Sequence, residues 1–345
     1  MKAACTLALV FAFPSTAAFS DEKKPRTLDI HWIDTEGGAA TLIVTPLGES
    51  ILADTGNPGE RDAGRIARTA KAAGVERIDH VITTHWHLDH VGGLEKLAEL
   101  VPLGAFYDHG VPEPLSQDVR PQDLASYRRV TKGKTRVLQP GDEIALKSAP
   151  GLPPLKLRIV AGDGLVAGEP KHQIERPCEK GHTAKPIDTS DNAKSLAFVL
   201  SFGEFDFFDG GDLTWNVEHK LACPKNIAGT VDVYQTDHHG LDQSNNPALI
   251  EALSPTVAIM NNGARKGGEA GTCAALRRFV KPEAVFQVHR SVRIDPKLNA
   301  APENVANDEE ACSGHGLLLS VEPDGKAYTV HVPSKGTKRR YESKK

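Results

Sequence analysis

A short segment of the chain carries four side chains of the kind that bind metals. The stretch TTHWHLDHVGG, residues 83–93, places three histidines and one aspartate within six positions, directly after a strand-like run. Alternate side chains of an extended segment point the same way, so His85 and His87 share a face, while Asp89 and His90 follow as the chain turns toward a helix. Imidazole and carboxylate are ligands that zinc, iron and manganese accept. The segment predicts a metal site with two adjacent groups of ligands.

A site of this composition predicts hydrolysis. A bound divalent metal lowers the pKa of water from 15.7 to about 7, and a second metal polarises the substrate oxygen. Zn²⁺ is the expected metal, as one or two ions, with Mn²⁺ or iron as alternatives. The sequence contains no G-x-S-x-G, phosphate loop or dinucleotide fingerprint, which would favour other chemistries. The competing interpretation is a metal-binding protein on a hydrolase scaffold with little turnover.

The same segment resembles the signature H-x-H-x-D-H of the metallo-β-lactamase superfamily. Two further motifs agree with this resemblance. ILADTG is similar to an early strand whose aspartate, here Asp54, would orient a metal ligand, and FFDGGD is similar to a later strand whose last acid, Asp212, would bridge two metals. The resemblance extends from Leu28 to about Val332. It implies an α/β (α+β) fold, a four-layer αβ/βα sandwich with the metal site at one edge.

Within that superfamily, the pattern is most similar to the hydrolase domain of bacterial DNA-uptake (competence) channel proteins, because SDNAKS, GGD and DHHG occur in the same order. In DHHG, His238 is preferred as the late metal ligand and His239 is the alternative. The histidine that does not bind metal is a candidate proton donor. The expected metal ligands are thus His85, His87, Asp89, His90, Asp212 and His238, and the expected catalytic residues are Asp89, Asp212, His238 and His239.

The resemblance is incomplete at one position. Many members with two metals carry another histidine about twenty residues before the bridging acid, and in this chain Asn192 or Ser195 stands there. Amides and hydroxyls are poor ligands for these metals compared with imidazole. The first metal is therefore expected to have three protein ligands, from His85, His87 and Asp212, unless His182 folds back to replace the missing group.

The first twenty residues are typical of a signal peptide. Lys2 precedes an apolar run, and a small-x-small pattern ends at Ser20. The run is shorter than the roughly 20 residues that span a bilayer, so we expect cleavage after about Ser20, no membrane span in the mature protein, and a periplasmic or secreted location. Four cysteines then remain, and an even number in an exported protein favours disulfides. The pairs predicted from chain proximity are Cys178 with Cys223 and Cys273 with Cys312.

The remaining sequence predicts one domain, 27–335, followed by a disordered basic tail, 336–345. Apolar and β-branched runs predict strands at 28–33, 39–45, 50–56, 78–84 and 156–161, a hairpin at 195–212 turned at Gly203, and later strands around VDVYQ, PTVAIM, AVFQVH, GLLLSV and AYTVHV. Helices are predicted at 61–73, 93–101, 247–253 and 271–280. The region 149–190 predicts mostly long surface loops. DTEGG, at 34–38, is interpreted first as a tight turn and second as a wall of the site.

Charge and cation placement bear on the substrate. The formal net charge of −4 among 345 residues does not indicate nucleic acid or an anionic membrane as a partner, although nucleic acid is not excluded. We expect a phosphodiester or small-molecule substrate, with lactone, thioester and amide hydrolysis as alternatives. Arg265 and Lys266 are candidate phosphate contacts, although charge runs are more often solvated faces. His289, which ends a predicted strand, is interpreted first as structural and second as part of a site-lining loop.

Overall fold

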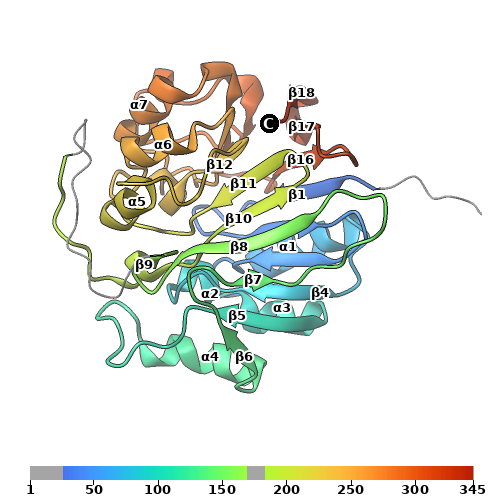
Figure 1. Cartoon of the computed structure of the whole chain (residues 1–345), viewed down its shortest axis with the longest axis vertical. Helices are drawn as coiled ribbons and strands as arrows, with labels where there is room; N and C mark the ends of the chain where they lie inside the picture. The colour runs from blue at the N-terminus through green and yellow to red at the C-terminus, as the bar shows by residue number, and fades with distance from the viewer. Residues whose placement is uncertain (1–25, 169–182, 345) are drawn as a thin grey trace, which may run out of the picture.

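The computed structural model describes residues 26–168 and 183–344, in which two mixed β-sheets pack face to face with helices on their outer faces (Figure 1). The first sheet has the order β18-β17-β16-β1-β2-β3-β4-β5-β6 and the second β15-β14-β13-β12-β11-β10-β8-β7, with β9 paired to β8. The strands are β1 (Leu28–Trp32), β2 (Thr41–Val44), β3 (Ser50–Ala53), β4 (Ile78–Ile82), β5 (Leu103–Asp108), β6 (Thr135–Val137), β7 (Glu143–Ile144), β8 (Leu155–Gly162), β9 (Leu165–Val166), β10 (Ala197–Phe202), β11 (Phe205–Asp209), β12 (Val233–Gln235), β13 (Val257–Met260), β14 (Val285–His289), β15 (Val305–Asn307), β16 (Leu317–Val321), β17 (Ala327–Val332) and β18 (Thr337–Glu342).

Helices cover both sheets, which confirms the predicted four-layer sandwich. The helices are α1 (Glu60–Ala72), α2 (Leu88–Val91), α3 (Leu94–Leu100), α4 (Pro121–Thr131), α5 (Trp215–Ala222), α6 (Pro247–Leu253) and α7 (Ala270–Phe279), with short 3₁₀ turns at Asp191–Lys194, Asp237–Gly240, Pro282–Ala284, Pro296–Leu298, Pro302–Asn304 and Pro333–Lys335. Helices α1 to α4 lie beside the first sheet and α5 to α7 beside the second (Figure 1). No helix in the described part is long and apolar enough to cross a membrane.

The alternation of side chains along the strands separates two apolar cores. Ile30 and Trp32 of β1 join the large core between the sheets, which also contains Phe207. Leu42 of β2 and Leu52 of β3 point the other way, into the core beneath the helices. Because successive side chains of a strand leave opposite faces, one strand serves both layers. The first sheet is therefore covered by apolar side chains on both of its faces.

The strands that bear the predicted motifs end at one edge of the sandwich. β3 runs parallel to β4, so Asp54 and the segment after Ile82 emerge side by side. β11 runs parallel to β12, which brings the Gly210–Asp212 turn next to Asp237–Gly240. These carboxyl ends belong to different sheets, and the site therefore lies where the two sheets meet.

Part of the predicted organisation is wrong. The basic tail, predicted as disordered, forms β18, which pairs antiparallel with β17. Its side chains alternate between half-buried and exposed, and Tyr341 stacks on Tyr328 with ring centroids 5.4 Å apart. Backbone hydrogen bonds to the edge of the sheet order a segment whose composition is polar, and Lys and Arg on an edge strand oppose further strand addition.

Several predictions fall on residues that the structure does not describe. The signal peptide at 1–20 lies outside the described residues, as do His182 and Cys178, so the predicted cleavage and the pairing of Cys178 with Cys223 stay predictions. Sequence analysis assigned no element between 101 and 149, where the structure has β5, α4, β6 and β7.

Candidate metal centre

The carboxylate of Asp212 lies at the centre of the site and faces four imidazoles. Its Oδ1 is 3.1 Å from His90 Nε2 and 3.4 Å from His239 Nε2. Its Oδ2 is 3.4 Å from His238 Nε2 and 3.9 Å from His85 Nε2. Asp212 is buried. One carboxylate with two histidines on each oxygen is the arrangement expected of an acid that bridges two metals.

On the Oδ1 side, four ligand atoms converge. Asp89, His90, Asp212 and His239 each offer one atom, and these atoms all lie within 4.8 Å of one another. His90 Nε2 and His239 Nε2 are 3.3 Å apart, and Asp89 Oδ2 is 3.2 Å from His239 Nε2. The structure therefore places His239, and not the preferred His238, with the Asp89 and His90 ligands.

On the Oδ2 side, His238 lies where the additional histidine was missing from the sequence. Its Nε2 faces Asp212, and the amide nitrogen of Asn192 is 3.5 Å from that Nε2. Asn192 thus occupies the expected place along the chain but contacts a histidine supplied by another motif. Both histidines of DHHG face Asp212, and the Oδ2 side has two imidazoles, those of His85 and His238.

The backbone of the DHHG turn explains how adjacent residues serve opposite sides. His238 and His239 both have left-handed φ values, 53° and 54°. Non-glycine residues rarely adopt this conformation, and each instance costs about 1–2 kcal/mol. The ring centroids are 6.1 Å apart. A Cβ on Gly267 would meet the carbonyl oxygen of His239 at 2.0 Å, so the packing of that glycine helps to hold the strained turn.

His87 is oriented differently from the other predicted ligands. Its Nε2 is 2.7 Å from Asp118 Oδ2, and its ring lies 4.6 Å from that of His85. Asp118 also accepts the backbone N–H of Asp191. Sequence analysis missed Asp118, because it lies 31 residues from His87 in a loop without a recognisable motif. His87 therefore borders the Oδ2 side through its ring and is held by an outer carboxylate.

Comparison with known proteins agrees with this geometry. The profile described as "Metallo-beta-lactamase superfamily" matches residues 33–206, about half of the chain. The chain belongs to the metallo-β-lactamase superfamily. It is therefore a metal-dependent hydrolase with a histidine and aspartate site.

Similarity to individual proteins is local or distant. The chain is 34% identical over 84 residues to the atrochrysone carboxyl ACP thioesterase dmxR1 of Cryptosporiopsis sp. (strain 8999), covering 24% of this chain and 26% of that protein. It is 31% identical over 62 residues to the β-lactamase-like protein 2 homolog of Caenorhabditis elegans, covering 18% and 21%. Both relatives are matched over about a quarter of their length or less. CmlA, a diiron β-hydroxylase from Streptomyces venezuelae, matches at 17% identity and TM-score 0.38, covering 69% of this chain and 45% of CmlA.

In this superfamily member, outer residues orient the imidazoles of His85 and His90. Asp54 Oδ2 lies 2.6 Å from His90 Nδ1, and Thr84 Oγ1 donates to the same oxygen at 2.7 Å. Because the Thr84 hydroxyl uses its only hydrogen in the bond to Asp54, its oxygen accepts a hydrogen bond from His85 Nδ1, 3.1 Å away. With a metal bound, each imidazole would keep its proton on Nδ1 and direct the lone pair on Nε2 to the cation. The role predicted for Asp54 fits these contacts.

The donor set fits a metal. His85 Nε2 is buried and has no hydrogen-bond partner among the described residues. A buried imidazole nitrogen without a partner is costly, and a cation between it and Asp212 would satisfy it. His, His and bridging Asp ligands are typical of zinc and also suit iron or manganese. The family and the geometry thus support a metal site made of histidine and aspartate ligands.

Charges in the site are strongly coupled. Burial would raise the pKa of Asp212, but His239, His90 and His238 together hold it well below its usual range. Burial lowers the pKa of His85 well below its ordinary value and that of His238 to about 4. The pKa of His90 is instead well above its ordinary value, because Asp212, Asp54 and Asp89 outweigh the effect of burial. The negative charge of Asp212 and the low pKa values of His85 and His238 favour binding of a metal cation.

One cation lies at the outer side of the cluster. The ammonium group of Lys266 contacts Asp89 Oδ2, and 40% of the Lys266 side chain is exposed. Lys266 lies in the loop after β13, and its Cβ packs against Gly37 of the DTEGG turn. This turn therefore forms part of the site wall, as its second interpretation predicted.

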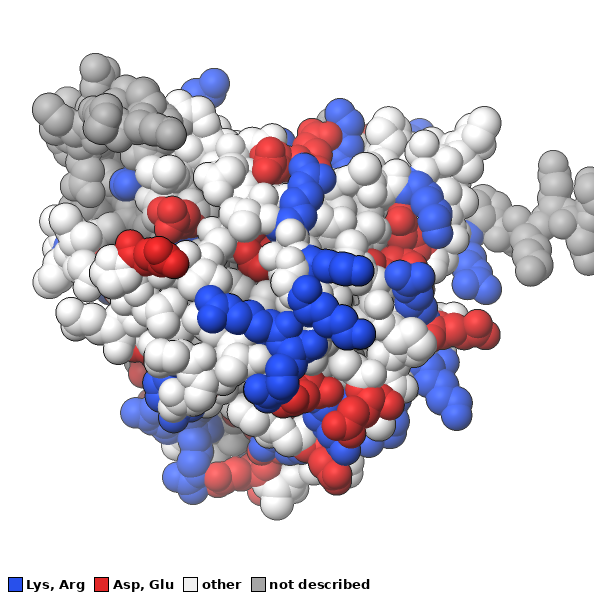
Figure 2. Space-filling model, turned by 90° about the horizontal axis from the view of Figure 1, so that it is seen from below, with Lys and Arg blue, Asp and Glu red and all other residues white. Residues whose placement is uncertain are grey.

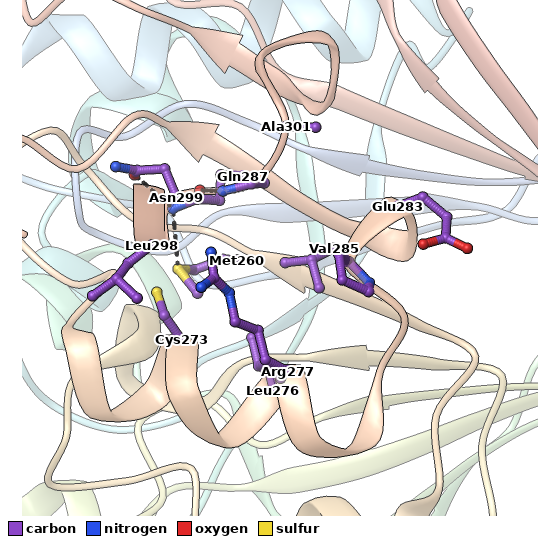
Figure 3. A pocket seen from close by; sticks show the side chains of 12 residues that line it. Met260, Cys273, Leu276, Arg277, Glu283, Val285, Gln287, Leu298, Asn299 and Ala301 are labelled. Atoms are coloured by element: carbon purple, nitrogen blue, oxygen red, sulfur yellow. Dashed lines mark hydrogen bonds between the residues drawn. The ribbon is translucent and has the colours of Figure 1, made fainter. Parts of the chain in front are cut away.

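The predicted disulfide between Cys273 and Cys312 is wrong, since both are free thiols. Cys273 lies on α7 beside Met260 and Leu298 in a mainly apolar pocket (Figure 3). Burial raises the pKa of its thiol to about 11. Cys312 instead contacts Asp34, which follows β1. Proximity along the chain was a poor guide because β14 and β15 intervene between the two cysteines.

Proposed function

We propose that this protein hydrolyses phosphodiesters with a two-metal site bridged by Asp212. The observation that carries the proposal is the division of imidazoles between the oxygens of Asp212, two on each side. Two divalent cations, when bound, activate water and polarise the phosphoryl oxygen. Separate sets of protein ligands on the two sides support simultaneous binding of two ions.

The chain's own residues have distinct roles in this proposal. Asp89, His90 and His239 hold one cation, and His85 and His238 hold the other with Asp212 between them. Asn192 can donate its amide N–H to a substrate oxygen near His238, because Asn192 Oδ1 and Nδ2 are both buried beside that ring. The proton donor expected from the unused histidine of DHHG has no candidate there, since both rings face Asp212. Water is the remaining proton source.

Lys266 supports an anionic substrate. Its ammonium group neutralises Asp89 at the exposed side of the cluster, and a short rotation of its flexible side chain would bring it onto a phosphate or carboxylate oxygen. The similarity to the DNA-uptake hydrolase domain rests on the sequence motifs alone. It favours a phosphodiester among the anionic substrates.

Thioester hydrolysis is the second candidate, with lactone and amide hydrolysis after it. The support is local: the Cryptosporiopsis relative is by name a thioesterase acting on an acyl carrier protein. A carrier protein presents its acyl group on a phosphate-containing arm, so a cation such as Lys266 would also serve this substrate. A metal-binding protein with little turnover is the competing proposal.

Export and a polyanionic partner are further proposals. The signal-like residues at 1–20 support a periplasmic or secreted location with zinc loaded there. Figure 2 shows Lys and Arg side chains gathered on one face of the molecule. Exposed cations of α4, β6 and the turn between them include Arg128, Lys132, Lys134 and Arg136. A nucleic acid bound there would give activity that falls steeply with salt, whereas a small diester would not.

The test uses the mature protein, its bound metal per chain, and phosphodiester, thioester, lactone and β-lactam reporters. We expect roughly two metals per chain, from the two ligand sets, and greatest turnover on the phosphodiester, abolished by His85→Ala. Lys266→Ala should raise KM about tenfold, which is the effect expected from the loss of one modest hydrogen bond to a charged group. Arg265→Ala is the matched control, because Arg265 is exposed and pairs with Glu310 away from Asp89. Metal content near zero, or turnover that survives His85→Ala, would contradict the proposal.

A further inference from the structure

We propose that Asp34, His289 and Cys312 form a second metal site that takes one zinc-like divalent cation. The three ligand atoms lie within 4.8 Å of one another, and none of the three residues belongs to the Asp212 centre. The inference does not depend on phosphodiester hydrolysis or on any other activity of the main site.

The three residues come from separate parts of the fold. Asp34 follows β1 in the first sheet, and His289 ends β14 in the second sheet. Cys312 lies in the connection from β15 to β16, where the chain passes from one sheet to the other. Asp34 and His289 are fully buried and Cys312 is half-buried. A cation held by all three would tie the two sheets together at this point.

The distances suit a small tetrahedral ion. His289 Nε2 lies 2.8 Å from Asp34 Oδ1, Cys312 Sγ lies 3.4 Å from Asp34 Oδ2, and Sγ lies 3.9 Å from His289 Nε2. Zinc bonds of about 2.3 Å to sulfur and about 2.0–2.1 Å to nitrogen or oxygen separate neighbouring ligand atoms by roughly 3.3–3.6 Å. The observed values lie on both sides of this range. Shifts of about half an ångström would therefore suffice.

A catalytic cysteine triad is a poor explanation of the same contacts. In a triad the thiol and the carboxylate use opposite nitrogens of the imidazole ring. Here Asp34 and Cys312 both face Nε2, while Nδ1 is buried and has no partner among the described residues. Burial is also the main reason that the pKa of the Cys312 thiol is raised, which opposes a reactive thiolate. Convergence on one nitrogen favours coordination over proton relay.

The surroundings set the charge and proton balance of the site. Arg65 donates to Asp34 Oδ2 at 3.1 Å and pairs with Glu36, which holds the Asp34 carboxylate in place. On binding, the Cys312 thiol would release its proton to solvent, and the proton on His289 would move from Nε2 to Nδ1. The cation, the thiolate and the carboxylate then balance in charge. Affinity should rise with pH because ligands must lose protons.

Cobalt substitution tests the proposal by a spectroscopic signal that the main site cannot give. The ligands at the Asp212 centre are histidines and aspartates, so a thiolate-to-Co²⁺ charge-transfer band must come from a cysteine. We expect this band when the full-length protein is stripped of metal and titrated with Co²⁺, together with about one further metal per chain beyond those at the Asp212 centre.

Variants assign the band to its source. Cys312→Ser should abolish it and remove about one metal equivalent, and His289→Gln should weaken Co²⁺ binding at the same site. Cys273→Ser is the matched control, because Cys273 is the other free cysteine among the described residues and lies on α7. His90→Ala should leave the band intact while reducing hydrolysis, which separates this inference from the function of the main site. Absence of the band in the unmodified protein, or its persistence in Cys312→Ser, would overturn the proposal.

Discussion

Two groups of buried carboxyl side chains in this protein have pKa values shifted in opposite directions. Asp89 and Asp212 have pKa values held well below the usual range: burial opposes this, and the facing histidines outweigh it. Asp237, the first residue of the DHHG turn, and Glu218 of α5 have raised pKa values, mainly because they are buried, and the neighbouring Glu218 raises the pKa of Asp237 further. Asp209 behaves like this second group, and burial raises its pKa to about 7.

The difference shows that burial alone does not decide the charge of an aspartate. Asp212 and Asp237 are equally inaccessible to water, yet one faces four imidazoles and the other faces a second carboxyl group. Desolvation raises the pKa of both, and only the first has nearby donors to reverse it. The carboxyl groups that face the metal centre are held in the charged form, whereas burial favours the protonated form of the second group. Substituting Asn for Asp in each group should sharpen this contrast.

Asp212→Asn should have the largest effect. The amide cannot bridge two cations, and it removes the negative charge that the four imidazoles face. We expect kcat/KM on the phosphodiester reporter to fall by more than about 100-fold, beyond the 10–100-fold typical of outer partners of a metal site. Bound metal should fall in parallel. Retention of activity within about tenfold would remove Asp212 from its central role.

Asp209→Asn should change the pH dependence of stability. The pKa of Asp209 is raised above its usual 3.8 to about 7, so its stabilising contribution is present below about pH 4 and is lost as pH rises through 7. Asn mimics the protonated form and can still accept the Gly211 N–H. Relative to the variant, the metal-free native sequence should lose up to a few kcal/mol between pH 5 and 8. Urea unfolding across this range measures it, and parallel pH profiles would refute it.

Asp237→Asn should have the smallest effect. If Asp237 is neutral and donates to Glu218, an amide N–H replaces its O–H without a change of charge. We expect unfolding free energy to change by less than about 1 kcal/mol and kcat/KM to stay within about threefold, as for exchange of one neutral hydrogen bond. A loss as large as that of Asp212→Asn would show that the charge on Asp237 is needed.

Much of the fold and the first half of the site could be predicted from the sequence. The motif around His85 and His90 is local, and the strand patterns before Asp54 and Asp212 reflect the burial of alternate side chains. The choice between His238 and His239 could not be predicted. It depends on two successive left-handed residues and on the close packing of Gly267, which is 28 residues away.

Contacts between distant segments account for the other failures. Asp118 meets His87 through a loop, and Cys312 meets Asp34 across 278 positions. The tail was predicted as disordered from its composition, yet β17 offers it an unpaired edge, and Tyr341 finds Tyr328 there. The local sequence patterns used for the prediction do not indicate which distant segments come into contact. Residues 103–137 were left unassigned for the same reason: α4 has only a weakly amphipathic sequence and packs partly on α3.

The DHHG turn has a consequence for the motion of the site. The side chains of His238 and His239 are attached to consecutive Cα atoms, which a trans peptide keeps about 3.8 Å apart. A displacement of this loop therefore moves both Cα atoms together, because covalent bonds fix the distance between them. The two sides of the centre thus depend on the position of one loop, whereas a site built from independent loops would depend on two.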